Sequence, residues 1–352
     1  MFSRVVYAVL FASAVFGQTR SITVAVDGTG DFRNVQDAIN SVPDNNTVPR
    51  VIHIKPGRYQ EQIRIAREKP WITLRGDDPK TTVITFHLAA STAGGTGKSG
   101  SAYFLADNTT AENLTFENTF GLGSQAVAVY TGADRLIFRN CHFLAWQDTL
   151  YANGPGCSGP DKCETGRQYF VDCYIEGHVD FIFGNAIAFF ERCEIRSKAS
   201  GYVAAQSKLF ADHQSGYVFY RCRLTAGEGV LGVGAHGAPK PADSVPAEEA
   251  TVAKNAPIRV FLGRPWRPYS TVVYIECDLG RHIRAEGWDN WRNPANEKTA
   301  WFGEFHSTGP GANADARVSW SHQLSDAETK KFERSEWLAG GPEGWRQVSA
   351  AR

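Results

Sequence analysis

The sequence lacks the features that mark nucleic-acid-binding and nucleotide-binding proteins. Its 37 Lys and Arg residues balance 37 Asp and Glu residues, so net charge gives no sign of nucleic-acid binding. The glycine pair in Asp27-Gly28-Thr29-Gly30 lacks the third glycine and the ribose-binding acid of a dinucleotide fingerprint. There is one methionine, whereas 34 glycines and frequent Val, Ile, Phe and Tyr favour short strands and tight turns over long helices.

No apolar run is long enough to span a membrane. The most apolar stretch, Val5 to Phe16, follows Arg4 and ends in small residues before Gln18. This pattern predicts a secretory signal peptide over residues 1–17, followed by one domain over residues 18–352. A buried first strand is the alternative interpretation. We therefore expect a secreted protein with neither nucleic acid nor membrane as a partner.

Metal-ligand spacing is also missing. Cys157 and Cys163 do not form a C-x-x-C pair, and no two histidines are spaced as H-x-x-x-H. Five histidines are therefore interpreted as structural: His87, His142, His178, His213 and His236. We expect no metal site and no cofactor.

What the sequence does contain is a repeat. Five of its seven cysteines recur in one context, each before an alternating strand-like segment: Cys141, Cys173, Cys193, Cys222 and Cys277. Cys173 to Cys193 is a step of 20 residues, and aligning 113–119 with 135–141 gives a step of 22. Such periods indicate a solenoid. Leucine-rich repeats need consensus leucines and asparagines that are missing here, so we predict an all-β, single-stranded right-handed parallel β-helix.

Segments that interrupt the repeat predict its ends and loops. Helical spacing over 35–39 indicates a short N-terminal capping helix, and the capping box at 325–328 indicates a C-terminal helix that covers the last coil, with an extended tail. Residues 89–101 have the composition of a surface loop. The insertions 154–166 and 235–257 are expected to line a binding face.

Two acidic residues lie in apolar, strand-like runs. Asp180 lies in Gly177–Gly184 and Asp148 in Trp146–Tyr151. Desolvating a carboxylate is costly unless it is paired or used, and pairing with a structural arginine is the simpler alternative. Each acid follows its coil's cysteine by seven residues, which predicts neighbouring positions about 4.8 Å apart.

Two carboxylates this close cannot both ionise easily, so one would keep a proton near neutral pH. The pair is suited to supply a nucleophile and a general acid. Gln147 beside Asp148, and Gln125 one repeat earlier, offer amide N–H donors for a developing oxyanion.

The sequence resembles the pectin methylesterases (pectinesterases), secreted carbohydrate esterases built on a right-handed parallel β-helix. Five segments carry the resemblance in family order: GRYQE at 57–61, QAVAV at 125–129, QDTLY at 147–151, GHVDFIFG at 177–184 and LGRPW at 262–266. Each is short, but the ordered set is specific. The sequence departs from the family pattern at two places, which affect the shape of the binding groove. Val129 stands where the family commonly has Leu, and the loop with Cys157 and Cys163 lengthens the interval between Asp148 and Asp180.

The resemblance implies a role for each matching residue. Asp180 would be the nucleophile, and Asp148 the general acid and later the base. Gln125 and Gln147 would form the oxyanion hole. Arg264 would hold Asp180 ionised, and Trp266 would stack on a sugar ring, the alternatives being a surface arginine and ordinary packing. Substrate contacts are expected from these residues: Gln125, Arg264, Trp266, Val179, Phe183 and Tyr151.

The implied reaction is hydrolysis of the C6 methyl ester of galacturonosyl units in pectin, releasing methanol. A polygalacturonase or pectate lyase on the same fold is the first alternative, but neither explains two glutamines beside the acids. A non-catalytic cell-wall adhesin is the second, and it would gain nothing from paired buried acids. With capped ends, the β-helix is expected to be a monomer.

The sequence also predicts the state of the cysteines and possible glycosylation sites. We predict a disulfide between Cys157 and Cys163 within the polar loop, because both lie in one short insertion. The repeat cysteines should mostly be buried thiols, although Cys173 and Cys193 could bridge. Three N-x-[ST] sequons begin at Asn45, Asn108 and Asn113.

Overall fold

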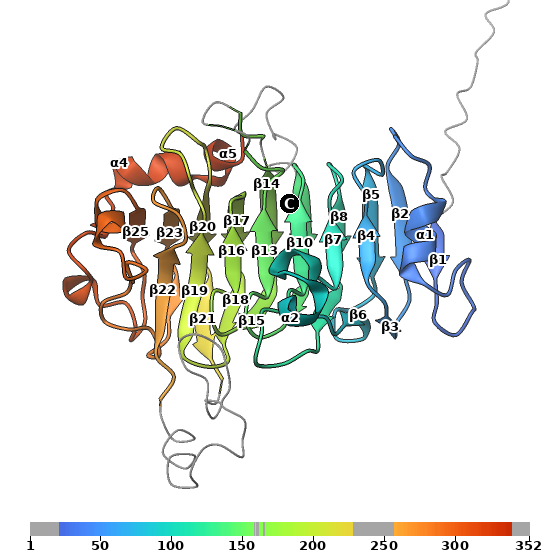
Figure 1. The fold of residues 1–352 in the computed structure, drawn as a ribbon, viewed down its shortest axis with the longest axis horizontal. Helices are drawn as coiled ribbons and strands as arrows, with labels where there is room; N and C mark the ends of the chain where they lie inside the picture. Colours follow the sequence, from blue (N-terminus) through green and yellow to red (C-terminus); the bar gives the residue numbers. More distant parts are fainter. Residues whose placement is uncertain (1–20, 158, 160–161, 165, 228–256, 340–352) are drawn as a thin grey trace, which may run out of the picture.

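The computed structural model describes residues 21–157, 159, 162–164, 166–227 and 257–339. Within them the strands form three parallel sheets of eleven, eight and seven strands, here called sheets A, B and C. Each full coil of the chain contributes one strand to each sheet in turn, so strands of consecutive coils lie side by side along the long axis (Figure 1). This confirms the predicted parallel β-helix.

Each sheet takes its strands from successive coils of the chain. Sheet A contains β1 (Ile22–Val24), β2 (Arg50–Ile54), β5 (Ile72–Gly76), β8 (Thr110–Glu112), β11 (Leu136–Arg139), β14 (Arg167–Val171), β17 (Ile187–Glu191), β20 (Gly216–Tyr220), β23 (Thr271–Ile275), β25 (Trp301–Phe305) and β26 (His322–Gln323). Sheet B contains β3 (Gly57–Gln60), β6 (Thr82–Phe86), β9 (Thr115–Asn118), β12 (His142–Leu144), β15 (Tyr174–Gly177), β18 (Glu194–Ser197), β21 (Arg223–Ala226) and β24 (Asp278–Leu279). Sheet C contains β4 (Ile63–Ile65), β7 (Ala102–Phe104), β10 (Val129–Gly132), β13 (Leu150–Asn153), β16 (Ile182–Gly184), β19 (Gly201–Gln206) and β22 (Val260–Pro265).

The coil interior is apolar and layered by side-chain type. One row on sheet A stacks aromatic rings at 4.5 to 4.9 Å between centroids, nearly parallel from coil to coil: Phe138, Phe170, Phe190, Phe219 and Tyr274. Rings in consecutive coils meet because parallel strands pair without offset. Aromatic pairs of this kind contribute about 0.5–1.5 kcal/mol beyond their burial.

One residue in the left-handed conformation makes the turn from sheet A to sheet B in successive coils. These turn residues have φ from 47° to 56°: Asn113, Asn140, Asp172, Arg192, Arg221 and Glu276. Their side chains also join neighbouring coils: Asn140 donates to Asn113 at 2.9 Å, and Arg192 binds both oxygens of Asp172. These contacts offset part of the conformational cost of a left-handed residue, about 1–2 kcal/mol.

The turn residues correct the repeat step of 22. Asn113 is level with Asn140, 27 residues later, and β9 pairs with β12, so the segments aligned from sequence, 113–119 and 135–141, lie in different sheets. The alignment was wrong because strands of sheets A and B share one apolar alternation. The step of 20 from Cys173 to Cys193 is confirmed by the pairing of β14 with β17 and of β15 with β18.

The cysteine after each turn points into the core. All five repeat cysteines are buried free thiols, so the bridge considered between Cys173 and Cys193 does not form. Their sulfurs face main-chain carbonyls of the preceding coil instead: Cys173 lies 3.5 Å from the oxygen of Phe138, and Cys193 lies 3.6 Å from that of Phe170. Burial also raises the pKa of Cys141 to about 12, which keeps this thiol protonated and unreactive.

The N-terminal end is closed by the predicted helix. Helix α1 (Val35–Ser41) buries Val35, Ala38 and Ile39 in the core. The Glu61 carboxylate accepts hydrogen bonds from the main-chain N–H groups of Val35 and Gln36 at 2.7 and 2.9 Å. These bonds satisfy donors at the start of the helix that have no partner within it.

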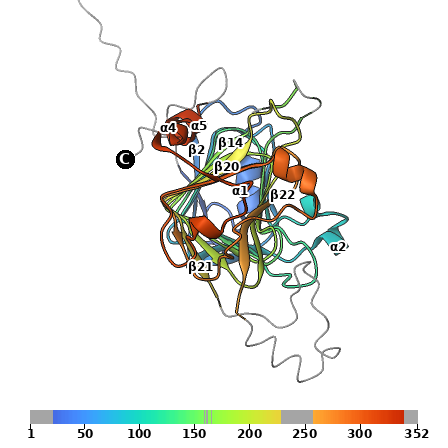
Figure 2. The same cartoon turned by 90° about the vertical axis from the view of Figure 1, so that its left-hand side faces the viewer.

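The C-terminal helices do not cover the last coil as predicted. α4 (Asp326–Thr329), the 3₁₀ turn η5 (Lys330–Phe332) and α5 (Arg334–Trp337) lie along the outer face of sheet A (Figures 1 and 2). Phe332 and Trp337 pack there against strands as distant as β17, and the Trp337 indole donates to the oxygen of Ala188. This cover explains why β17 is buried on both faces. The capping box at Ser325 is confirmed.

The segment 89–101, predicted as a surface loop, contains α2 (Ala90–Ala93) and the 3₁₀ turn η1 (Thr96–Lys98). Further short turns are η3 (Pro294–Lys298) and η4 (Ala314–Ala316). The predicted signal peptide, His236 and most of the insertion 235–257 lie outside the described residues. Within the described part of the chain, no helix has the length and apolar character needed to cross a membrane.

Candidate active site

The two acids lie just before adjacent strands of sheet C, at matching positions, as the cysteine spacing predicted. β13 pairs with β16 so that Leu150 is level with Ile182, and Asp148 and Asp180 each precede these residues by two positions. The N–H of Asp148 donates to the oxygen of Val179 at 3.1 Å, which holds the two segments together. Asp148 and Asp180 are both 8% exposed. The acids therefore form a pair at the surface of neighbouring coils.

The backbone conformation around the two acids explains which residue types occur there. Asp148 has φ 64° and Asp180 has φ 51°, a left-handed conformation that aspartate tolerates better than most residues. The segment that carries Asp180 begins at Gly177. Only glycine fits there, because a Cβ would collide with the side chains of Phe181 and Thr149. Gly184 ends it with φ 121°, a conformation that favours glycine.

Arg264 binds Asp180 through two hydrogen bonds. Its Nε and one terminal nitrogen donate to the two carboxylate oxygens at 2.8 and 2.6 Å. The guanidinium lies between two aromatic rings, 3.7 Å from the Tyr202 centroid and 3.8 Å from that of Trp291. Arg264 is 7% exposed, so water screens this pair little. The pairing favours the ionised form of Asp180.

Asp148 has the opposite environment. Burial raises its pKa well above the usual range, the negative charge of Asp180 raises it further, and Arg264 partly opposes both effects. Within the described residues, its carboxyl group has no hydrogen-bond partner, unlike that of Asp180. The neighbouring acids thus differ as a proton donor and a nucleophile should.

The two glutamines flank the pair on the N-terminal side. Gln147 directly precedes Asp148. The main-chain oxygen of Gln147 accepts a hydrogen bond from the N–H of Ala126 at 3.1 Å, which places Gln125, one coil earlier, beside Gln147. Both side chains are half-buried. Their main chains are held by this hydrogen bond and by one from Ala90 to the oxygen of Gln125 at 2.8 Å.

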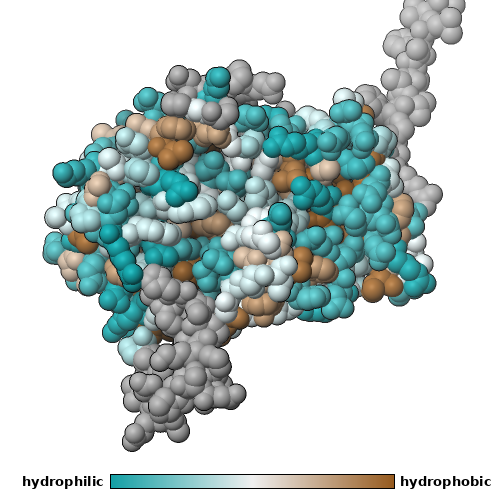
Figure 3. Space-filling view, in the orientation of Figure 1, coloured by the Kyte–Doolittle hydropathy of each residue, from teal (hydrophilic) through white to brown (hydrophobic). Residues whose placement is uncertain are grey.

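An aromatic surface continues from the acids across sheet C. Tyr151 stacks on Phe183 at 4.1 Å between centroids, and Trp266 lies 6.3 and 6.0 Å from these rings. Tyr151 and Trp266 are half-buried, whereas Phe183 is 4% exposed and Val179 only 1%. Of the expected substrate contacts, Tyr151 and Trp266 therefore offer the most surface, and the Val179 side chain offers almost none. Figure 3 shows this side of the molecule, where hydrophobic and hydrophilic residues intermingle.

The disulfide between Cys157 and Cys163 is confirmed. His213 lies 3.6 Å from the sulfur of Cys157, which brings three potential metal ligands together. Because both sulfurs are in the disulfide, this group offers only the histidine nitrogen as a free ligand atom. His178 is fully buried near Trp146, and burial lowers its pKa to about 4, so it is neutral at physiological pH.

Sequence reasoning missed the aromatic rings around Arg264. Tyr202 lies on β19, and Trp291 lies in a segment after β22 that carries no resemblance motif. The cluster of Trp288 and Trp291 is the one local signal that could have suggested an aromatic contact near the site.

Fold and site together define a class: a parallel β-helix protein with paired, buried aspartates beside an aromatic surface. Comparison with known proteins narrows this class. The pectinesterase family model matches residues 21–238 and 241–341. Pectinesterase 31 of Arabidopsis thaliana is 40% identical over 325 residues, covering 89% of this chain and 90% of that protein.

Solved structures agree. Pectin methylesterase from carrot superposes with a TM-score of 0.79 and 29% identity, covering 93% of this chain and 95% of that one. A pectin methylesterase in complex with a hexasaccharide gives a TM-score of 0.70 and 28% identity, covering 92% and 98%. The chain belongs to the pectinesterase family, and its activity is pectin methylesterase activity.

Proposed function

We propose that the enzyme removes the C6 methyl ester of galacturonosyl units through a covalent acyl-enzyme on Asp180. The observation that carries this proposal is the contrast between the acids: Asp180 is held by two hydrogen bonds from Arg264, whereas Asp148 has a raised pKa and no hydrogen-bond partner among the described residues. A charged nucleophile beside a protonated acid is what ester cleavage requires.

In the first half-reaction, an oxygen of Asp180 attacks the ester carbonyl carbon. The carbonyl oxygen becomes an oxyanion, which the amide groups of Gln125 and Gln147 stabilise by hydrogen bonds. The bond from carbon to the methoxy oxygen then breaks, and Asp148 gives its proton to that oxygen. Methanol leaves, and the galacturonosyl carbonyl remains bound to Asp180 as an anhydride.

In the second half-reaction, Asp148 acts as a base. Its carboxylate takes a proton from a water molecule, whose oxygen attacks the anhydride carbonyl. Asp180 leaves as a carboxylate that Arg264 again binds, and the polymer gains a free carboxyl group. Asp148 ends protonated, as it began, so the cycle is closed.

Product analysis on methyl-esterified pectin tests this function against the glycosidic-bond alternatives. We expect methanol without shortening of the polymer. Shorter chains would indicate a galacturonase, and unsaturated ends that absorb ultraviolet light would indicate a lyase. Asp180→Asn should lose methanol release while its circular dichroism spectrum shows that it remains folded. If folded Asp180→Asn keeps parental turnover, the assignment of the nucleophile is wrong.

The same proposal extends to substrate and location. Methyl-esterified homogalacturonan is the proposed substrate, with Tyr151, Phe183 and Trp266 as apolar surface for sugar rings. We also propose export by a signal peptide over residues 1–17 and a single catalytic domain over 18–352 that acts as a monomer. Mass spectrometry of secreted protein would test the cleavage, and light scattering the monomer.

A further inference from the structure

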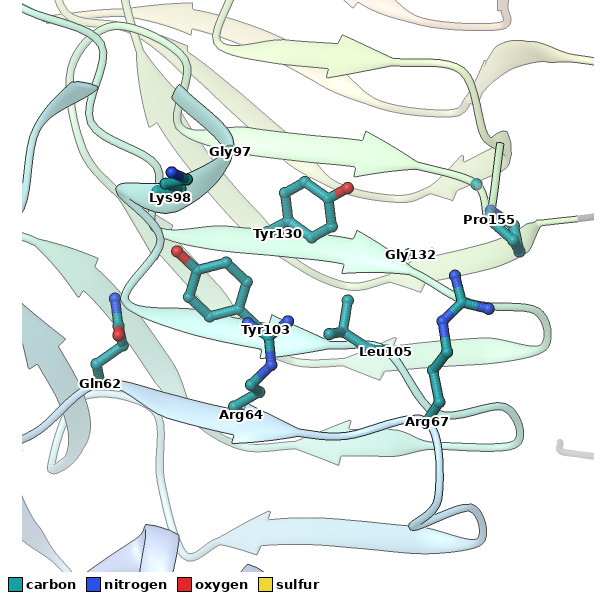
Figure 4. Close-up of a pocket in the computed structure, with 11 residues that line it drawn as sticks. Gln62, Arg64, Arg67, Gly97, Lys98, Tyr103, Leu105, Tyr130, Gly132 and Pro155 are labelled. Carbon is teal, nitrogen blue, oxygen red and sulfur yellow. The ribbon is translucent and has the colours of Figure 1, made fainter. Parts of the chain in front are cut away.

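Gln147 and Asp148 lie in a turn that leads from sheet B into sheet C. Residues 145–149 form this turn, between β12 of sheet B and β13 of sheet C. Figure 4 shows strands of sheet C side by side near the site, around a pocket lined by Tyr103 and Tyr130 among others. Within the described residues, the Asp148 carboxyl group has no hydrogen-bond partner. The position of this carboxyl group therefore depends on the backbone of the turn that carries it.

The Lys198 ammonium group reaches this turn from two coils further on. Its Nζ donates to the main-chain oxygen of Ala145 at 3.3 Å and lies 3.9 Å from the centre of the Trp146 ring. It also donates to Glu176 Oε1 at 2.8 Å, while Glu176 Oε2 accepts from the Tyr174 hydroxyl at 2.9 Å. The Lys198 and Glu176 side chains are 21% and 17% exposed, so water screens this pair less than a surface pair. One cation thus joins three consecutive coils.

The remaining contacts of the turn involve the coil of Asp180. The N–H of His178 donates to the main-chain oxygen of Trp146 at 3.0 Å, and the buried His178 ring lies 5.8 Å from the Trp146 ring between centroids. On the other side of the site residues, the Thr149 hydroxyl donates to the main-chain oxygen of Glu176 at 2.8 Å. The turn is therefore held both before and after Gln147 and Asp148. Lys198 is the cation among the anchors that precede them.

We propose that Lys198 is a positioning residue for the reaction: by holding Ala145 and Trp146, it keeps Gln147 and Asp148 where they can stabilise the oxyanion and transfer the proton. The inference rests on the proposed roles of these two residues. Among the hydrogen bonds and ion pairs of the described residues, none joins Lys198 to either of them, so Lys198 acts through the turn. Misplacing a reacting group by about 1 Å can lower a rate about 10²-fold, so an anchor of this turn matters for catalysis.

A role in stability alone is the alternative, because breaking a half-buried ion pair also destabilises a fold. Lys69 supplies the matched control. Its Nζ donates to the main-chain oxygens of Asn40 and Val42 beside helix α1 and lies 3.0 Å from a carboxylate oxygen of Asp44. The Lys69 side chain is 13% exposed. Lys69 therefore makes the same kinds of contact as Lys198, but it holds the N-terminal cap instead of the turn.

The kinetic test measures methanol release from pectin by Lys198→Met and Lys69→Met, well below the unfolding temperature of each variant. We expect Lys198→Met to lower kcat about tenfold with KM nearly unchanged, because one of several anchors is lost. Lys69→Met should keep the parental kcat although it too loses thermal stability. Lys198→Arg, which keeps a cation for Glu176 and the Trp146 ring, should recover most of kcat. Parental kcat in Lys198→Met, or equal losses of kcat in both methionine variants, would overturn the proposal.

Hydrogen–deuterium exchange supplies a readout that needs no substrate. The N–H groups of Asp148 and Leu150 donate to the main-chain oxygens of Val179 and Phe181, so their exchange reports on the turn. Exchange in a peptide that spans the turn should be faster in Lys198→Met than in the parent and unchanged in Lys69→Met. Unchanged exchange in Lys198→Met would also overturn the proposal. If Asp148→Asn kept parental turnover, the proposed role of Asp148 would be wrong, but exchange would still decide whether Lys198 holds the turn.

Discussion

Replacing Arg264 with alanine tests how the site divides work between its two acids. The change removes both hydrogen bonds from Arg264 to Asp180, at 2.8 and 2.6 Å, and leaves the Asp180 carboxylate beside the acid Asp148. Asp180 is only 8% exposed, so water replaces the lost donors poorly. The nucleophile should then be charged less often.

The magnitude follows from the burial of the pair. Removing one partner of a buried ion pair costs about 3–5 kcal/mol, because the other charge is left unpaired. If that cost falls on the reactive carboxylate, kcat/KM at neutral pH should fall by about 10² to 10⁴-fold.

The pH profile supplies the mechanistic readout. The limb that requires a charged nucleophile should move to higher pH, because Arg264 no longer favours the charged carboxylate of Asp180. The limb that requires protonated Asp148 should also move to higher pH, because Arg264 lowers the pKa of Asp148 in the parent. Both apparent values belong to the coupled pair.

The assay is initial methanol release from pectin at half-unit steps from pH 4 to 9. Arg264→Lys, which keeps the charge without the two-pronged geometry, should be intermediate. Arg192→Ala is the matched control: it removes a similar two-bond pair with Asp172, but the two side chains are 49% and 54% exposed. Exposed pairs contribute about 0–1 kcal/mol, so activity should be unchanged. A folded Arg264→Ala enzyme that loses activity without any shift of its pH profile would refute the reasoning.

Three further predictions follow from the same geometry. Gln147→Ala should lower kcat by about 10² to 10³-fold with KM changed only a few-fold, and a loss confined to affinity would assign Gln147 to binding instead. Asp148→Asn should unfold at a higher temperature than the parent above pH 5, and the difference should vanish near pH 4. Because the pKa of Asp148 is raised in the folded state, the folded parent holds a proton that the unfolded chain releases. The parent therefore loses stability as the pH rises, whereas the neutral asparagine does not. Its control is Asp172→Asn at an exposed turn, and identical unfolding of Asp148→Asn and the parent at pH 7 would contradict the argument. Peptide mapping without reduction should find Cys157 linked to Cys163, with the other five cysteines alkylated only after unfolding, and early labelling of Cys173 in folded enzyme would contradict its burial.

Sequence reasoning succeeded where a marker residue reports the position within a coil. Cys141 and Cys173 each follow a left-handed turn residue, and counting seven residues onward from them placed Asp148 and Asp180 side by side, as β13 and β16 confirm. The count works because turns of fixed length leave the register no freedom between the cysteine and the acid.

It failed where apolar alternation was the only guide. The segments that begin at Asn113 and Arg135 share a strand-like pattern, but one enters sheet B and the other sheet A. The residue in the left-handed turn is the better marker, since Asn113 and Asn140 occupy it in consecutive coils. Reading the asparagines rather than the apolar residues would have yielded the step of 27.

The position of the C-terminal helices was not predictable from their own sequence. A capping box marks where a helix begins but carries no information about what its apolar side will contact. The relevant signal lay far away, in the all-apolar run Ala186–Phe190, because a strand of sheet A that is apolar on both faces needs a cover on its outer face. Phe332 and Trp337 provide that cover.

In sheet C, strand pairing places one residue of each strand level with the next: Arg64, Tyr103, Tyr130, Tyr151, Phe183, Ala205 and Arg264. The members of this row are separated by up to 200 residues in sequence, and no local motif links them. In a parallel coil, however, one residue per strand is enough to define a row, because each strand pairs with the next without offset. Slipping any one strand by a single position would turn its member of this row to the interior and interrupt the surface beside the acids. The register that the turn residues set in the fold therefore also determines how far the catalytic surface extends along it.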